Sequence, residues 1–292
     1  MSKKDQKAQR HGTRRPKKPF KSEPGTSRSS GAKPRHRSGQ NTEAKPIEKG
    51  GGLWLFGKHP VLAALRNPKR PIKRLLVTKK SADHYLADFT DINQNNRDLT
   101  PEITSADVIE SLLPEDCIHQ GIALLTAPLP AIDLEDCCTI EGDDSHLILI
   151  LDQITDPHNV GAIIRSAAAF GARAIISPDR HSPPESGTLA KSASGTLEVV
   201  PWVRVTNLSR ALDQLAELGY WRLGMDGQAG LSIKQADFGK NIALIMGAEG
   251  RGLRKGTQDH CDALIKLPIQ RTVESLNVSN AAAIALYEFS AV

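Results

Sequence analysis

The chain has 292 residues, of which 39% are hydrophobic and 24% are charged, and these values are ordinary for a globular protein. This length is sufficient for two domains with hydrophobic cores of their own. The longest aliphatic run, Leu147 to Leu151, is far shorter than the roughly 20 residues of a membrane-spanning helix, and no apolar stretch follows the charged N-terminus as in a secretory signal. We therefore expect no membrane segment.

The net charge of +5 is divided unevenly along the chain. Residues 1–52 contain 15 Lys and Arg against 4 Asp and Glu, whereas the remainder carries a net charge of −6. Beyond Met1 this tail has only Phe20 and Ile47 as large apolar residues, which is too little apolar surface for a fold. We predict a disordered basic tail over 1–52 that is attracted to RNA phosphates. The alternatives are a solubilising tail without a partner and a mitochondrial presequence, although the tail has no Leu or Val for an amphipathic face.

The cysteines and histidines do not predict a metal site. The cysteines show no C-x-x-C spacing and no histidine pairs at the separations typical of zinc ligands. Free thiols without a disulfide framework suit a reducing compartment, so we expect a cytoplasmic protein. The four cysteines are Cys117, Cys137, Cys138 and Cys261.

Residues 53–127 have the pattern of a small α/β domain. Apolar spacing predicts a helix over 60–65 and strands over 72–78 and 121–126. The prolines and acidic residues that follow predict a linker over 128–145.

Residues 146–292 have the pattern of a larger α/β domain. The continuous aliphatic run His146–Leu151 is typical of a central parallel strand that is buried on both faces. A helix over 160–170 is expected next, with Asn159 as a candidate N-cap. Alternating strands and helices predict a mostly parallel open sheet. The further expected elements are strands at 174–176, 221–225, 241–246 and 263–267 and helices at 207–219 and 277–289.

Three polar segments are predicted to lie at or near strand ends, where α/β sheets bind small ligands: Asn159–Arg165, Gly247–Gly252 and Ser275–Ser279. The glycine spacing in the second segment matches neither a dinucleotide-binding fingerprint nor a P-loop. Three glycines in six residues allow the backbone to approach a ligand closely, with Glu249 among the exposed N–H groups. The alternative is a tight strand-to-helix turn with a solvated Glu249.

The three segments together resemble the motifs of the SpoU/TrmH family. They have the forms N-x-G-x-x-x-R, G-x-E-x-x-G and S-L-N-V-S, in that order. The resemblance implies an S-adenosylmethionine-dependent RNA ribose 2′-O-methyltransferase, a trefoil knot in the C-terminal domain and a homodimer whose active site draws on two chains. It further implies that the backbone of Gly247, Leu267 and Leu276 holds S-adenosylmethionine.

The resemblance also implies catalytic roles. Arg165 corresponds to the family's catalytic arginine, which is discussed there as a general base. Because arginine stays protonated at ordinary pH, we favour phosphate anchoring and stabilisation of the developing alkoxide. Asn159, Glu249 and Asn277 are expected to orient the reacting groups, and Ser279 to fix the last helix or to contact substrate. The alternative for Asn159 and Asn277 is that they only cap helices, which does not exclude a catalytic role.

The first domain carries a second resemblance. Phe56–Pro60 and His119–Gly121 are similar to the substrate-binding domain of a branch whose members methylate a guanosine in large-subunit rRNA. This similarity favours rRNA as the RNA partner. The alternatives are a tRNA 2′-O-methyltransferase and a catalytically inactive RNA-binding ribosome assembly factor. Asn280 stands where small apolar residues are common in the family. This departure bears on the expected dimer contact at the last helix and not on the activity.

Overall fold

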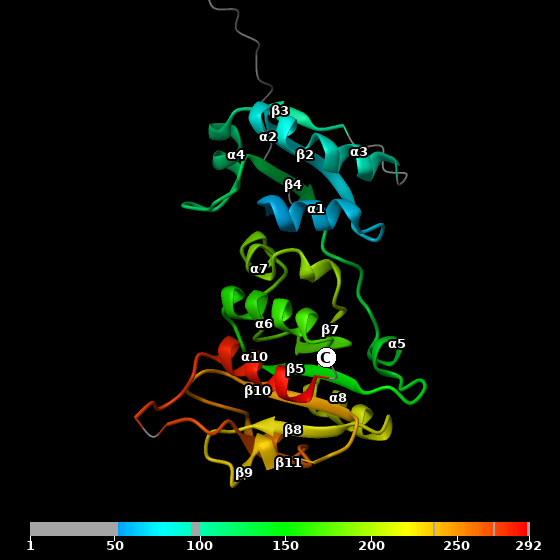
Figure 1. The fold of residues 1–292 in the computed structure, drawn as a ribbon, viewed down its shortest axis with the longest axis vertical. Helices are drawn as coiled ribbons and strands as arrows, with labels where there is room; N and C mark the ends of the chain where they lie inside the picture. Colours follow the sequence, from blue (N-terminus) through cyan, green and yellow to red (C-terminus); the bar gives the residue numbers. More distant parts are fainter. Residues whose placement is uncertain (1–51, 95–99, 236, 271, 291–292) are drawn as a thin grey trace, which may run out of the picture. The chain divides into compact units, whose positions relative to one another are not determined.

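The computed structural model describes residues 52–94, 100–235, 237–270 and 272–290, which form two β-sheets and the helices that cover them (Figure 1). Both sheets belong to one compact unit. The predicted basic tail, 1–52, lies outside the described residues except for Gly52. None of the described helices is long and apolar enough to cross a membrane.

The smaller sheet contains four strands in the order β1-β4-β2-β3. Strand β4 pairs antiparallel with β1 and β2, whereas β2 and β3 are parallel. Helix α1 buries Val61, Leu62, Ala64 and Leu65 in the hydrophobic core that includes this sheet. The elements are β1 (Leu53–Phe56), α1 (Lys58–Arg66), β2 (Ile72–Thr78), α2 (Lys79–His84), α3 (Leu86–Gln94), β3 (Glu102–Thr104), α4 (Ala106–Leu112) and β4 (Ile122–Thr126).

The larger sheet contains seven strands in the order β7-β6-β5-β10-β8-β11-β9, and each neighbouring pair is parallel. The prediction of a mostly parallel sheet is confirmed, whereas the trefoil knot stays a prediction. The strands are β5 (His146–Asp152), β6 (Ala174–Pro178), β7 (Trp202–Val205), β8 (Trp221–Met225), β9 (Leu231–Ser232), β10 (Asn241–Gly247) and β11 (Ala263–Lys266). The helices are α5 (Leu134–Cys138), α6 (Pro157–Ala169), α7 (Gly187–Ala193), α8 (Leu208–Glu217), α9 (Lys255–Gln258) and α10 (Val278–Phe289), with 3₁₀ turns η1 (Thr196–Glu198) and η2 (Ile233–Gln235).

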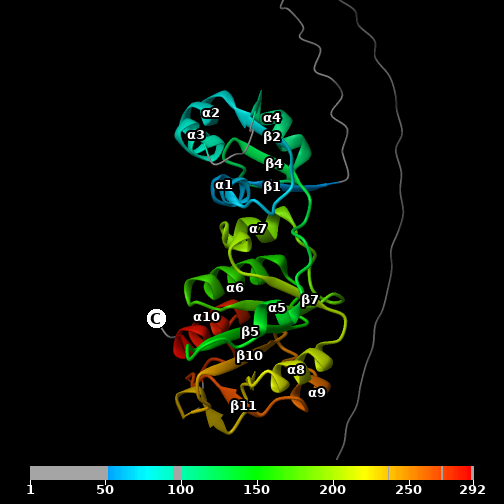
Figure 2. The ribbon, with the colours of Figure 1, turned by 90° about the vertical axis from the view of Figure 1, so that its right-hand side faces the viewer.

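Helices lie on both faces of the larger sheet (Figure 2), and a hydrophobic core covers each face. Successive side chains of a strand point to opposite faces, and every residue of β5 is buried. Leu147, Leu149 and Leu151 pack in the core with α6, α7 and α10, whereas Ile148 and Ile150 pack in the core with α5 and α8. This two-sided burial explains the continuous aliphatic sequence of β5.

The segment 128–145, for which a linker was predicted, contains helix α5. Its residues Leu134, Cys137 and Cys138 are buried against the larger sheet. Burial raises the pKa of Cys138 to about 12, so this thiol stays protonated and acts as an apolar core side chain. All four cysteines of the chain are free.

A buried ion-pair cluster joins the small domain to the segment around α7. Arg70, whose side chain is fully buried, donates to Glu198 at 2.5 Å, to Glu185, and to the carbonyl oxygen of Ala127 at 2.9 Å. Burial raises the pKa of Glu185, and the charge of Arg70 opposes that shift. Because Glu185 precedes α7 and Glu198 follows it, Arg70 holds both ends of this helical segment.

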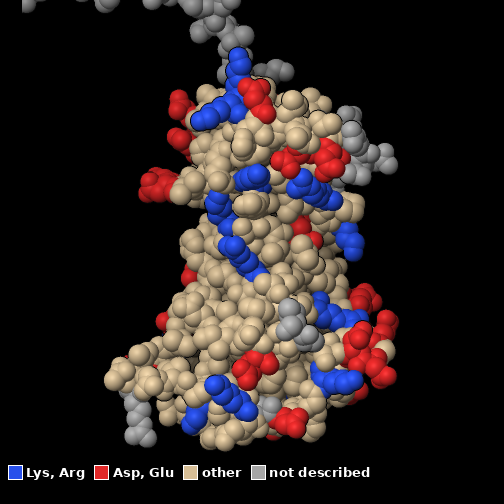
Figure 3. All heavy atoms as spheres, in the orientation of Figure 1, with Lys and Arg blue, Asp and Glu red and all other residues tan. Residues whose placement is uncertain are grey.

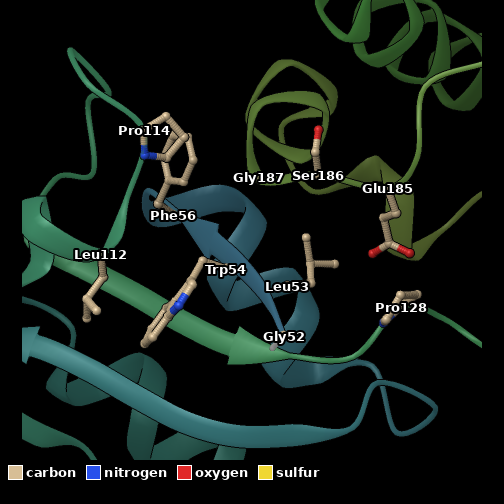
Figure 4. Close-up of a pocket in the computed structure, with 10 residues that line it drawn as sticks. All are labelled: Gly52, Leu53, Trp54, Phe56, Leu112, Pro114, Pro128, Glu185, Ser186 and Gly187. Carbon is tan, nitrogen blue, oxygen red and sulfur yellow. The ribbon is translucent and has the colours of Figure 1, made fainter. Parts of the chain in front are cut away.

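A cavity of about 500 Å³ lies beside this cluster, between β1 and the start of α7. Figure 4 shows Trp54, Phe56 and Leu112 toward one end and Glu185 with Pro128 toward the other. None of the predicted site residues lines it.

Candidate functional site

A second cavity lies at the carboxyl ends of strands in the larger sheet, as expected for a small-ligand site in a parallel sheet. Its volume is about 420 Å³, which is within the range of small-molecule and cofactor pockets. Segments that follow β8, β10 and β11 form its walls. The lining residues are Met225–Gln228, Met246–Gly252, Leu267, Ile269, Glu274–Leu276, Val278 and Ala281.

The glycine-rich segment after β10 forms a closed loop along this cavity. Ala248 and Gly252 exchange two backbone hydrogen bonds, at 2.8 and 3.2 Å, so the chain turns back on itself before α9 begins at Lys255. A Cβ atom at Gly247 would lie 2.3 Å from the carbonyl carbon of Gly252, so only glycine fits there. Glu249 is exposed on the loop. The segment is therefore a closed loop that requires glycine at position 247, and its role in ligand binding stays a prediction.

A buried carboxylate fixes the far end of the loop. Asp152, at the end of β5, is completely buried and accepts hydrogen bonds from the backbone N–H and the Nε of Arg254, at 3.1 and 2.7 Å. This pairing ties the loop of β10 to the neighbouring strand. Sequence reasoning missed Asp152, although a carboxylate directly after a buried aliphatic run is a signal for such a role.

The asparagines of two motifs meet next to the cavity. The Asn277 side-chain amide donates to the Oδ1 of Asn159 at 3.0 Å, across 118 residues of sequence. The Oδ1 of Asn277 accepts from the backbone N–H and the hydroxyl of Ser279, at 2.9 and 2.6 Å. Asn277 is the N-cap of α10, as expected.

The prediction that Asn159 caps α6 is wrong. The helix begins earlier, at Pro157, and the Asp156 side chain accepts hydrogen bonds from the N–H groups of His158 and Asn159. Proline suits the first position of a helix because its missing N–H would be unpaired there. Asn159 therefore lies within the first turn of the helix, and its side chain is available to bond Asn277.

Arg165 is not among the residues that line the cavity. It is exposed on α6, and within the described part of the chain its side chain has neither a hydrogen bond nor an ion pair. Helix α6 packs closely on α7 because Gly161 lacks a side chain: a Cβ there would lie 2.4 Å from the carbonyl oxygen of Leu189. The glycine of the first motif thus sets the packing of the helix that carries Arg165.

The structure brings most of the predicted site residues together. Gly247, Glu249, Leu267 and Leu276 line one cavity, and the network of Asn159, Asn277 and Ser279 adjoins it. Sequence reasoning missed the loop 226–228, although it directly follows a predicted strand. No group of three or more His, Cys, Asp or Glu in the described ranges could hold a metal ion.

A parallel sheet with a ligand cavity at its strand ends, next to a polar network and preceded by a smaller α/β domain, defines an α/β enzyme with an appended domain. Residues 146–287 match the model of the SpoU rRNA Methylase family, and residues 54–131 match the model for RNA 2′-O ribose methyltransferase substrate binding. The chain belongs to the SpoU rRNA methylase family. The resemblance of the three motifs to this family is confirmed.

The chain is similar along most of its length to proteins described as 23S rRNA (guanosine-2′-O-)-methyltransferase RlmB. It is 37% identical to that of Bordetella pertussis, covering 80% of this chain and 95% of the relative, and 39% identical to that of Ralstonia nicotianae, covering 80% and 93%. Among solved structures, the SpoU methyltransferase AviRb of Streptomyces viridochromogenes with the cofactor AdoMet has a TM-score of 0.68 and 25% identity. That match covers 82% of this chain and 89% of the other.

Proposed function

We propose that this protein transfers a methyl group from S-adenosylmethionine to the ribose 2′-hydroxyl of a guanosine in 23S rRNA. The observation that carries the proposal is the cavity formed by the glycine loop together with Leu267 and Leu276 in a chain that also has an RNA substrate-binding domain. The RlmB proteins that are similar over 80% of the chain support the guanosine and the 23S rRNA.

The cavity fits S-adenosylmethionine in chemistry and size. Leu267, Leu276 and Ile269 supply apolar walls for an adenine ring, and the backbone around Gly247 supplies polar groups. Glu249 and Glu274 line the same cavity and supply negative charge for a cationic ligand. When bound, the cofactor supplies the electrophilic methyl group.

The residues of the chain then position the nucleophile. We assign Arg165 to anchoring an RNA phosphate and stabilising the negative charge that develops on the 2′-oxygen. Asn159 and Asn277 orient the reacting groups through their shared hydrogen bond, and Ser279 fixes Asn277. Glu249 orients the cofactor or the ribose from the glycine loop.

The proposal also assigns a function to each domain and a cellular compartment to the enzyme. Residues 53–127 bind RNA, residues 146–292 carry the methyl transfer, and the tail 1–52 adds sequence-independent attraction to RNA. The matches to residues 54–131 and 146–287 support the first two assignments. A cytoplasmic location is part of the proposal and agrees with a ribosomal RNA substrate.

The proposal further includes a homodimer with composite active sites. Arg165 does not line the cofactor cavity, so a second chain can supply it. Helix α10 exposes Ile284 and Tyr287, whose relative exposures are 47% and 66%, and these suit an apolar contact between chains. Asn280, also exposed on α10, is polar and leaves that contact partly hydrated.

Mixed dimers test the composite site. At a limiting concentration of S-adenosylmethionine, a homodimer with Arg165→Ala and a homodimer with Gly247→Ala are each expected to methylate RNA much more slowly than wild type. In a co-expressed heterodimer, one site combines the intact cavity of the first chain with the intact Arg165 of the second, so activity returns. If the mixed dimer stays inactive while each chain still dimerises, the sites are not composite in this way.

Ribose-methylation mapping tests the reaction and the substrate together. Total rRNA and tRNA from cells lacking the protein are compared with RNA from complemented cells, and one 23S rRNA guanosine is expected to lose its 2′-O-methyl group. A lost tRNA methyl group instead would favour the tRNA alternative. Purified protein that takes up no S-adenosylmethionine would favour the inactive assembly factor.

Gly247→Ala is expected to weaken S-adenosylmethionine binding by about tenfold or more, since its Cβ would overlap the backbone of Gly252 and force the loop to move. Isothermal titration calorimetry measures the change. Gly227→Ala is the matched control, because Gly227 lines the same cavity but a Cβ there meets no atom within 4 Å. Equal losses in the two variants would contradict the assigned role of the loop.

A further inference from the structure

Lys and Arg side chains lie along the surface from the small domain to helix α6, which contains Arg165. Figure 3 shows Lys and Arg side chains in a line over α1, α7 and α6, on a molecule whose residues after position 52 are net acidic. Lys191 is the single Lys or Arg of α7, Arg165 is the single Lys or Arg of α6, and Lys58 begins α1. We call Lys58, Lys191 and Arg165 the basic track.

Lys191 is held at the junction of the two domains. Its Nζ donates to the side-chain oxygen of Gln120 at 3.0 Å, and the backbone N–H of Lys58 donates to the same oxygen at 3.0 Å. A Cβ at Gly57 would lie 2.3 Å from that Nζ, so the glycine leaves the space that the ammonium occupies. Gly57 and Gln120 belong to Phe56–Pro60 and His119–Gly121, the two segments whose sequences resemble an RNA substrate-binding domain. Lys191, from the larger domain, lies where these two segments meet.

The Lys191 ammonium has no anionic partner in the described part of the chain. Its bonded neighbour is a neutral amide oxygen, and partial burial lowers the pKa of Lys191. The Cys117 thiol is the one titratable neighbour that opposes this shift, and no carboxylate lies at ion-pair distance within the described residues. A partly desolvated cation without a counter-charge is stabilised when an anion binds beside it.

We propose that Lys191 binds a backbone phosphate of the substrate RNA, between the nucleotides on the small domain and the target nucleotide at Arg165. This inference rests on the proposed function. Phosphate contacts fix the register of a nucleic acid on a protein without reading its sequence. Lys191 is therefore a positioning residue, which sets the path of the RNA from the small domain to α6.

The salt dependence of RNA binding tests this assignment. Full-length protein is titrated with an unmodified 23S rRNA transcript between roughly 50 and 200 mM salt, where phosphate contacts weaken steeply. Lys191→Gln is expected to bind about tenfold more weakly at low salt, as for a lost charged hydrogen bond. Its slope of log affinity against log salt is expected to be smaller by about one. Lys191→Arg is expected to keep the wild-type slope, and S-adenosylmethionine affinity stays unchanged in both variants.

Two control variants separate charge from structure. Gln120→Ala removes the hydrogen-bond partner of Lys191 but keeps the ammonium, so the salt slope is expected to stay at the wild-type value. Lys240→Gln removes a cation at the amino end of β10, the opposite end from the cofactor cavity, where its Nζ bonds the carbonyl oxygen of Asp143. Its RNA affinity is expected to match wild type.

An acetylation experiment on the wild-type protein tests the same contact and does not depend on the folding of a variant. Acetylation by an amine-reactive ester is followed by mass spectrometry, and the transcript is expected to protect Lys191 but not Lys240. An unchanged salt slope in Lys191→Gln, or unprotected Lys191 in the complex, would overturn the inference. Wild-type protein that neither binds nor methylates the transcript would instead overturn the proposed function.

Discussion

Replacing Arg165 with alanine is expected to lower the rate of methyl transfer by roughly a hundredfold to a thousandfold, as for the loss of one donor that stabilises developing negative charge. The affinity for S-adenosylmethionine is expected to stay near the wild-type value, because Arg165 does not line the cofactor cavity. Single-turnover methylation of the transcript measures the rate, and calorimetry measures the affinity. Loss of cofactor binding in this variant would show that the role of Arg165 is misassigned.

Two further variants sharpen this prediction. Arg165→Lys keeps the charge but loses the planar pair of donors, so we expect a rate between those of the alanine variant and wild type. Arg210→Ala is the matched control, since Arg210 is also exposed but lies on α8, which packs on the opposite face of the sheet. Its rate is expected to equal that of wild type.

Arg70→Met is expected to lower the free energy of unfolding by about 3–5 kcal/mol, the cost of removing one partner from a buried ion pair. The substitution leaves Glu185 and Glu198 facing each other in a protein interior without their shared cation. Urea titration at a fixed protein concentration measures the change, since subunit association affects stability. Arg74→Met is the control, because the Arg74–Glu102 pair is partly exposed and a pair of that kind contributes only about 0–1 kcal/mol.

The pH dependence of stability gives a second readout of this cluster. Because burial raises the pKa of Glu185, this carboxyl group binds a proton more tightly in the folded state than in the unfolded state. The stability that this group contributes is fully present below the ordinary carboxyl pKa and is lost as pH rises through the raised pKa. Glu185→Gln, whose side chain cannot ionise, is expected to remove that part of the pH dependence. An unchanged profile in Glu185→Gln would contradict the raised pKa.

The local elements of the larger domain could be predicted well because their signals are local. The run from His146 to Leu151 can be buried on both faces only in a central strand, and the structure buries all of it. The start of α6 was misplaced because Asp156 and Asn159 are both good N-cap residues, although Pro157 is a sequence signal that favours Asp156. Helix α5 was missed because its amphipathic segment is short and lies among acidic residues.

The class of reaction could be predicted without a structure, since the motifs that contain Arg165, Glu249 and Asn277 occur together and in the order typical of the SpoU/TrmH family. The sequence also shows that the basic charge lies in the tail, because charge can be counted without a fold. The pairs of residues that meet in space could be found only from the folded chain: Asn277 bonds Asn159 across 118 residues, and Lys191 bonds Gln120 across 71. Such contacts depend on strand order and helix packing, which periodicity along the chain does not encode.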